Sequence, residues 1–330
     1  MVREKSSKPS TDLRQSWSRE AVIFALVAVM AWYFVYLRYR LNQEFPLATL
    51  ESFLDGTAHK PFQFRMLVPW LVGGLRSLGL GDAAMLYRAI DVMAVIGSYY
   101  ALRYYLGLYL KSHAALMAFA LFYALPWNYL LARDLTIILP YDLMAVTLTT
   151  LALGLAAREK WGLFYPVFVL GALNRETILL VTFAYAIASW GSQKRSQLAL
   201  HAVAQFAIWL GVKFAMGALY EQNPGQTFEY FHVGTQVPHW RTNLNVLANW
   251  PHLVLVLSTF GFVWVLIPVG WRRLRDSFPK KALWAVVPYL AMVLLIGNLN
   301  EIRVFGELLP FVLVPALIIA ASYLRETAPQ

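Results

Sequence analysis

Apolar segments that are long enough, or nearly long enough, to cross a membrane recur along the chain between short polar stretches. A spanning helix needs about 20 apolar residues, because the hydrocarbon core is about 30 Å thick and a helix rises about 1.5 Å per residue. The segments that we expect to cross singly are Ala21–Leu41, Arg88–Leu110, Ala114–Leu131, Ile137–Ala157, Ser196–Ala218, Pro251–Gly270, Leu283–Gly297 and Val304–Tyr323.

The composition agrees with this pattern, since 59% of the 330 residues are hydrophobic and only 14% are charged. A soluble domain contains about 25% charged residues, so we predict one integral-membrane domain over residues 1–330. The absence of cysteine excludes disulfides, thiolate metal sites and cysteine nucleophiles. The formal charge of +10 fits Lys and Arg side chains that flank the spans, and we expect no nucleic acid partner.

The first 20 residues are polar and basic, and no small-residue cleavage site follows the apolar stretch Ala21–Tyr36. We therefore predict a retained first helix with residues 1–20 in the cytoplasm.

The segment Phe64–Leu80 is interrupted by Arg65, a proline, two glycines and Arg76. Suppose that this segment crossed the membrane. The basic linker at residues 158–160 could then stay in the cytoplasm only if the basic N-terminus lay outside. That arrangement contradicts the positive-inside rule, by which cytoplasmic loops carry an excess of Lys and Arg. We therefore predict amphipathic surface helices within a first extracytoplasmic loop, residues 42–87.

The longest apolar run, Trp161–Trp190, contains charges only at Arg175 and Glu176. A charge at bilayer depth costs about 2.5–3.5 kcal/mol, so such a pair needs a partner or a function. A single span would place eight downstream Lys and Arg side chains outside, so we predict a hairpin of two short helices, Trp161–Leu173 and Thr177–Trp190. The polytopic bundle then has about ten crossings, with both termini in the cytoplasm.

This threading gathers polar side chains on the outer side, in the first loop, around residues 132–142, at the hairpin tip and at residues 298–307. Arginine suits phosphate recognition because its guanidinium offers paired donors at full charge, and a nearby carboxylate suits general-base work on a hydroxyl. The candidate bases are Asp55, Asp142 and Asp134. The candidate substrate-binding residues in these regions are Arg65, Arg133, Tyr141, Asn174, Arg175, Glu176, Glu301, Arg303 and Glu307.

The same residues also have a purely structural interpretation. Asp142 suits the first turn of a helix, and Asn174 suits a helix cap. Arg303 and Glu307 are spaced as a pair one helical turn apart. In that case Arg175 and Glu176 neutralise the charges of residues 301–303 across a helix interface. The sequence alone does not decide between phosphate binding and such passive pairing.

The second large outer loop, residues 219–250, is rich in aromatic and histidine side chains. His232 and Trp240 are candidates for sugar or acceptor binding, although Tyr and Trp are also common at membrane interfaces. The histidines lack a helical metal-binding spacing, so we expect no metal site and no cofactor besides the donor substrate.

The layout resembles the C-type superfamily of membrane glycosyltransferases, which take sugars from polyprenyl-phosphate carriers on the extracytoplasmic side. Four segments are also similar to a group of bacterial membrane proteins related to that superfamily, namely Phe62–Trp70, Pro140–Asp142, Leu173–Thr177 and Glu301–Pro310. The resemblance implies a catalytic acid in the loop after the first helix, where Asp55 fits best, ahead of Glu51 and Glu44. The family's Asp-x-Asp or Glu-x-Asp pair is missing here, which leaves metal dependence and the identity of the base open.

We therefore expect an inverting glycosyltransferase of the bacterial inner membrane, with its site facing the periplasm or exterior. It would move a sugar from a polyprenyl-phosphate donor to a glycan, lipid or protein acceptor. Two alternatives stay open, a transporter or flippase for a lipid-linked or anionic substrate and a non-catalytic subunit of an envelope polysaccharide assembly. Transporters commonly contain paired interrupted helices, and the sequence indicates only one interrupted segment, which favours the enzyme.

Overall fold

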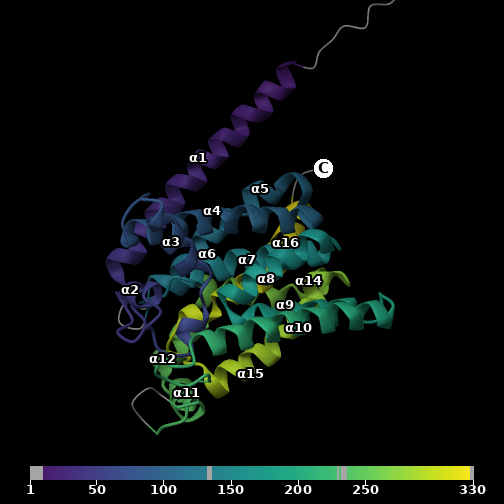
Figure 1. Cartoon of the computed structure of the whole chain (residues 1–330). Coiled ribbons are helices and arrows are strands. Elements are labelled where there is room, and N and C mark those ends of the chain that lie inside the picture. The colour runs from purple at the N-terminus through teal and green to yellow at the C-terminus, as the bar shows by residue number, and fades with distance from the viewer. Residues whose placement is uncertain (1–9, 132–135, 229, 232–235, 328–330) are drawn as a thin grey trace, which may run out of the picture.

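The computed structural model describes residues 10–131, 136–228, 230–231 and 236–327, and nearly all regular structure in these ranges is helical (Figure 1). The two strands found there, β1 (Gln43–Glu44) and β2 (Ile137–Ile138), pair in parallel over two residues. The predicted all-α fold is confirmed.

The first half of the chain contains α1 (Ser10–Leu41), α2 (Leu50–Leu54), η1 (Phe62–Phe64), α3 (Leu67–Ser77), α4 (Ala83–Leu110), η2 (Lys111–His113), α5 (Ala114–Met117), α6 (Ala120–Tyr129) and α7 (Asp142–Ala157). The second half contains α8 (Trp161–Asn174), η3 (Glu176–Ile178), α9 (Leu179–Ser189), α10 (Arg195–Leu219), α11 (His239–Ala248), α12 (Trp250–Leu257), η4 (Thr259–Val265), α13 (Leu266–Val269), η5 (Trp271–Arg273), α14 (Phe278–Ala282), η6 (Leu283–Ala285), α15 (Val286–Ile296), η7 (Ile302–Leu308) and α16 (Leu309–Thr327). The η elements are short 3-10 helices.

Several helices have the length and composition of membrane spans. By these two criteria the described residues contain four such helices, at Trp17–Leu41, Arg195–Leu219, Phe278–Ile296 and Ile302–Leu324. Four of the other predicted crossings correspond to shorter apolar helices, at Ala114–Tyr129, Asp142–Ala157, Trp161–Asn174 and Glu176–Ser189. The chain is thus an all-α bundle with helices suited to a membrane.

A fifth apolar segment is bent and not straight. The helices Trp250–Leu257 and Thr259–Val269 meet at 72°. Phe260, Gly261 and Phe262 there have φ values of 57°, 64° and 61°, outside the helical region. The backbone amide of Phe260 donates to Asn128 on α6 over 2.9 Å, which holds the break in place. The prediction of one interrupted segment in the chain is therefore wrong, because this is a second one.

The predicted helical hairpin is confirmed. Trp161 at the start of α8 and Tyr185 near the end of α9 have ring centroids 4.9 Å apart. A straight helix would separate them by about 36 Å along its axis. The hairpin base is closed by Gln193, whose side-chain amide donates to Glu159 over 2.7 Å.

The surface helix predicted in the first loop is α3. At 11 residues it is about 16 Å long, too short to cross a bilayer. It buries Val68 and Val72 against the bundle and exposes Trp70 and Leu71. A short helix in the first loop that covers the bundle is therefore present, and its position at a membrane surface stays a prediction.

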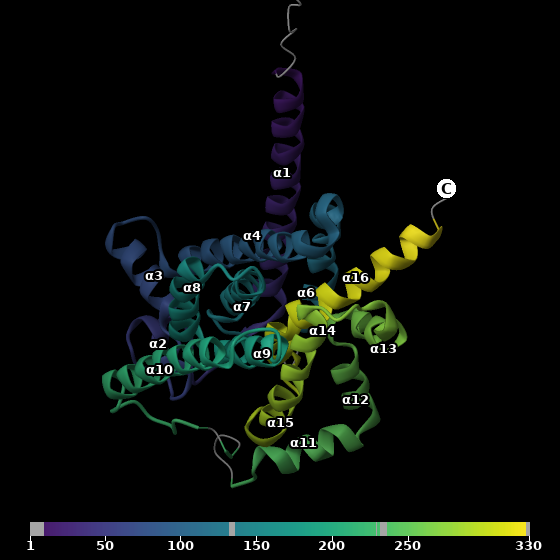
Figure 2. The same cartoon turned by 90° about the vertical axis from the view of Figure 1, so that its right-hand side faces the viewer.

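The two ends of the bundle are built from different loops. At one end α2 and α3 lie near the segment before α11, where Lys60 donates to the Glu221 carbonyl over 2.8 Å (Figure 1). At the other end lie the hairpin base and the chain's C-terminus, and Figure 2 shows α1 leading away from the bundle. The long first loop and the hairpin base are thus at opposite ends.

Candidate functional site

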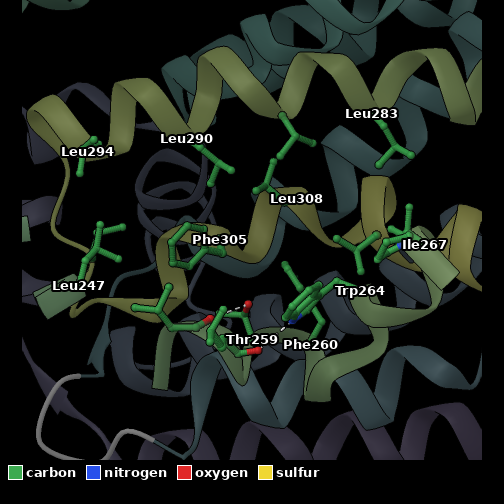
Figure 3. Close-up of a pocket in the computed structure, with 16 residues that line it drawn as sticks. Leu247, Thr259, Phe260, Trp264, Ile267, Leu283, Leu290, Leu294, Phe305 and Leu308 are labelled. Carbon is green, nitrogen blue, oxygen red and sulfur yellow. Dashed lines mark hydrogen bonds between the residues drawn. The ribbon is translucent and has the colours of Figure 1, made fainter. Parts of the chain in front are cut away.

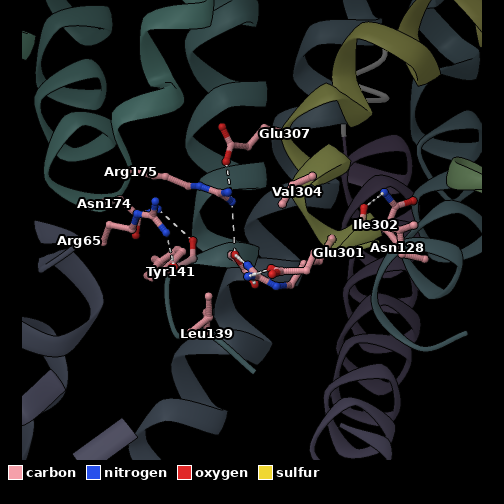
Figure 4. A network of polar contacts seen from close by, with 12 residues as sticks. Arg65, Asn128, Leu139, Tyr141, Asn174, Arg175, Glu301, Ile302, Val304 and Glu307 are labelled. Carbon is pink, nitrogen blue, oxygen red and sulfur yellow. Dashed lines mark hydrogen bonds and ion pairs between the residues drawn. The ribbon is translucent and has the colours of Figure 1, made fainter. Parts of the chain in front are cut away.

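The hairpin tip places Arg175 inside the bundle. Arg175 has an extended backbone, φ −164° and ψ 136°, which interrupts the helix between α8 and η3. Its guanidinium Nη1 lies 2.7 Å from the Glu307 carboxylate and 3.3 Å from that of Asp142 (Figure 4). The charge of Arg175, which lies within an apolar run of the sequence, is therefore paired with carboxylates in the structure.

Asp142 is the centre of this network. It begins α7, as expected for an acid in the first turn, and its side chain is fully buried. Its carboxylate lies 3.2 Å from Arg303, 3.3 Å from Arg175 and 3.7 Å from Arg38. Three guanidinium groups from three distant segments therefore meet one carboxylate.

Arg65 links the first loop to the hairpin tip. Its Nε and Nη2 donate to the two carboxylate oxygens of Glu176 over 3.1 and 2.7 Å, a bidentate pair. A third nitrogen donates to the Tyr141 hydroxyl, and the guanidinium lies 4.6 Å from the Tyr141 ring centroid. Burial lowers the pKa of Arg65, but the charges of Glu176 and Tyr141 and the hydrogen bonds to both outweigh it, so this pKa lies well above its usual range.

Asn174 is the last residue of α8, and its side-chain amide donates to the Tyr141 carbonyl over 2.9 Å. The expectation that Asn174 caps the following helix is wrong, since η3 begins after Arg175 and has no side-chain cap hydrogen bond. Asn174 instead fixes the hairpin tip to the loop before α7.

The segment before the last helix supplies Glu301, Arg303 and Glu307. Arg303 contacts Asp142 and Glu301, whereas Glu307 contacts Arg175. The predicted pairing of Arg303 with Glu307 is wrong, because η7 is a 3-10 helix in which residues four apart no longer share a face. The hairpin charges also do not neutralise Glu301 directly, since Arg175 reaches Asp142 and Glu307.

The sequence interpretation missed two members of the network. Arg38 near the end of α1 lies 2.5 Å from Asp91 on α4, and both side chains are buried. Arg38 also donates to the Leu139 carbonyl over 3.0 Å. Asp91 is an acid within a predicted span, and such a residue is by itself a reason to look for a buried partner.

The network is almost balanced in charge. Its cations are Arg38, Arg65, Arg175 and Arg303, and its anions are Asp91, Asp142, Glu176, Glu301 and Glu307. Passive pairing is thus part of its role. Among the arginines of the network, three buried nitrogens have no hydrogen bond within the part of the chain that is described, namely the Nε atoms of Arg38, Arg175 and Arg303. Each of these three donors is thus buried without a protein acceptor.

Some predicted site residues lie elsewhere. Asp55 ends α2 with an exposed side chain, and within the described ranges no ion pair joins it to the network. Phe53, two residues earlier, packs its ring on Tyr141 at 6.0 Å between centroids, so α2 borders the site. Trp240 lies on α11 and is 39% exposed. Arg133, Asp134 and His232 lie outside the described residues.

An apolar cavity of about 540 Å³ lies beside the network (Figure 3). It is bounded by α15 and by the bent pair of α12 and η4. Leu299, Phe305 and Leu308 line it from the same segment that carries Arg303 and Glu307. One short stretch of chain therefore faces an apolar cavity on one side and a charged network on the other.

Within the described residues, no group of three or more histidine and carboxylate side chains is arranged to hold a metal ion. No protein-family model, curated protein or solved structure matches the chain.

Proposed function

We propose that this chain is a membrane glycosyltransferase that takes a sugar from a polyprenyl-phosphate donor. The observation that carries the proposal is the two-sided segment at residues 299–308, which borders both the apolar cavity and the arginine network. A polyprenyl phosphate has the same two parts, an apolar chain and an anionic head. The volume of the cavity lies within the usual range of about 300–1,000 Å³ for ligand sites.

In this proposal the arginines Arg175 and Arg303 hold the donor phosphate through their spare Nε donors. Asp142 is poorly suited to act as the base, because it is fully buried and faces three guanidinium groups. Its role is to position the arginines.

Asp55 has the exposed carboxylate that a general base for an acceptor hydroxyl requires. The hydroxyl oxygen would bond to the anomeric carbon as the bond from that carbon to the phosphate oxygen breaks. Asp55 would take the hydroxyl proton. The leaving polyprenyl phosphate would keep the electron pair of the broken bond, and the arginines would stabilise its negative charge. Attack opposite to the leaving group inverts the anomeric carbon.

We further propose about ten crossings, with both termini in the cytoplasm and the site facing outward. The proposal is supported by the hairpin, which returns the chain to its starting side, and by the separation of the first loop from the hairpin base. With this orientation the basic loops lie on the cytoplasmic side, as the positive-inside rule requires.

The test is sugar transfer by the purified chain in vesicles that contain a polyprenyl-phosphate sugar. Asp55→Asn is expected to lower kcat by about 10²–10⁴-fold, the usual contribution of a general base. Glu51→Gln is the matched control, because Glu51 is also an exposed acid on α2 and pairs with Arg76 at 3.0 Å. Normal transfer by folded Asp55→Asn and Arg175→Ala variants would refute the assignment, and loss with Glu51→Gln alone would move the base to Glu51.

One observation favours a second candidate, a transporter of a lipid-linked anion. The break at Ser258–Phe262 adds a second interrupted segment to the hairpin, and interrupted helices line binding sites in transporters. A transporter would move a labelled lipid phosphate between leaflets without chemical change. Transfer of the sugar without such movement favours the enzyme.

A further inference from the structure

A second cavity, of about 300 Å³, lies between α1 and α4 and contains two arginines. Arg40 and Arg88 line it together with Trp32, Tyr36 and Tyr39. Its lining residues recur at helical spacing on each helix, so the cavity is a groove between two packed helix faces. None of these residues belongs to the network around Asp142.

Among the described residues, these two arginines differ from those of the network in having no acidic partner. Within the described part of the chain, no carboxylate forms an ion pair with Arg40 or Arg88. The guanidinium of Arg88 lies over the Tyr39 ring, 5.2 Å from its centroid, which holds it at the groove. Both side chains are exposed, so the groove presents two accessible guanidinium groups.

The positions of the lining residues along the two helices indicate the kind of ligand that fits the groove. Arg40 is one residue from the end of α1, and Arg88 lies in the second turn of α4, so both are near the loop that joins these helices. Trp32, about 12 Å deeper along α1, stacks on Tyr36 with ring centroids 5.9 Å apart and is 60% exposed. Charge at the helix ends with aromatic and aliphatic side chains below it matches a lipid headgroup and its chain.

We propose that this groove binds the phosphate headgroup of an anionic membrane phospholipid. The guanidinium groups of Arg40 and Arg88 donate to the phosphate oxygens, and the acyl chain lies along Trp32, Val35 and Val92. The inference does not depend on the proposed transfer reaction, because the lipid is bound and not converted.

The test uses the purified full-length chain in a non-ionic detergent, titrated with phosphatidylglycerol, with phosphatidylcholine or with inorganic phosphate. Phosphatidylglycerol is expected to raise the melting temperature and to remain bound in native mass spectra, whereas the other two are not. A hydrogen bond to a charged group contributes about 1.5–3 kcal/mol, so Arg40→Gln with Arg88→Gln is expected to weaken phosphatidylglycerol binding by at least about tenfold.

Arg76→Gln is the matched control, because Arg76 is an exposed arginine on α3, in the loop that joins α1 and α4, and has its own partner, Glu51. This variant is expected to bind phosphatidylglycerol as the unchanged protein does. If the double Gln variant does not fold, Arg40→Lys with Arg88→Lys replaces it, since lysine keeps the charge and loses the paired donors. Unchanged binding by the arginine variants, equal effects of the two lipids, or stabilisation by inorganic phosphate alone would each overturn the proposal.

Discussion

Arg175 and Asp142 lie 3.3 Å apart, although 33 residues separate them along the chain. The contact joins the tip of the α8–α9 hairpin to the first turn of α7. The same Asp142 oxygen accepts from Arg303 over 3.2 Å, so the segment before α16 is tied to the same point. Three parts of the bundle therefore depend on one buried carboxylate.

Replacing Asp142 should destabilise the fold strongly. Asp142→Asn leaves three guanidinium groups facing a neutral amide, and the loss of one partner from a buried ion pair costs about 3–5 kcal/mol. The measurement is the free energy of unfolding in detergent. Asp55→Asn is the control, and as an exposed change it should stay within about 0.5 kcal/mol. Equal stability of the two variants would mean that the network does not support the fold.

The hairpin and much of the network could be predicted from sequence. Arg175 and Glu176 within an apolar run indicate a buried site, and the distribution of Lys and Arg along the chain predicts that this run forms a hairpin and not a single span. The pairing within the network could not be predicted in the same way. Glu307 pairs with Arg175 and not with Arg303, because the turn type of η7 and the packing of distant helices decide which groups meet.

The bend after α12 had no clear signal in the sequence. Its one glycine, Gly261, lies between two phenylalanines in an apolar stretch that is interrupted by Ser258 and Thr259. The conformation is set by α6, where Asn128 accepts from the Phe260 amide and Tyr123 donates to the Gly261 carbonyl over 3.1 Å. Such long-range contacts are invisible in the pattern of the segment itself.

A methyl group at Gly261 should therefore be costly. Gly261 has φ +64°, and a Cβ there would lie 2.5 Å from the indole nitrogen of Trp127 and 2.5 Å from a ring carbon of Tyr123. Overpacking and backbone strain each cost about 1–3 kcal/mol, so Gly261→Ala should lower the melting temperature clearly. Gly211→Ala on α10 is the control, since its Cβ meets nothing within 4 Å and alanine favours a helix by about 1 kcal/mol. A melting temperature equal to that of the control would contradict the bent geometry.

The absence of cysteine allows a direct test of the proposed topology. In a chain with no native cysteine, a single introduced thiol reports its own side of the membrane. Thr57→Cys in the first loop should react with an impermeant maleimide in intact cells, whereas Ser196→Cys at the start of α10, just after the hairpin, should react only after permeabilisation. Both positions are exposed in the structure, so any difference in labelling reports the side of the membrane on which each thiol lies. Labelling of both from outside would rule out the proposed threading.

The apolar cavity yields a test of how the donor lipid is held. Leu290 on α15 lines the cavity, whereas Leu295 on the same helix does not, although the two are 43% and 51% exposed. Leu290→Trp should fill space that a polyprenyl chain would occupy. Excluding about 60 Å² of apolar surface from contact costs about 1.5 kcal/mol, so KM for a long-chain donor should rise about tenfold. Because neither Asp55 nor the arginines are changed, kcat should stay the same.

Leu295→Trp adds the same side chain outside the cavity and should leave KM unchanged. A donor with a short carrier should be insensitive to both substitutions, because it does not reach the space near Leu290. An equal rise in KM for both variants would point to a general effect of tryptophan on α15. An unchanged KM with Leu290→Trp would separate the cavity from the donor and leave the arginine network as the sole basis of recognition.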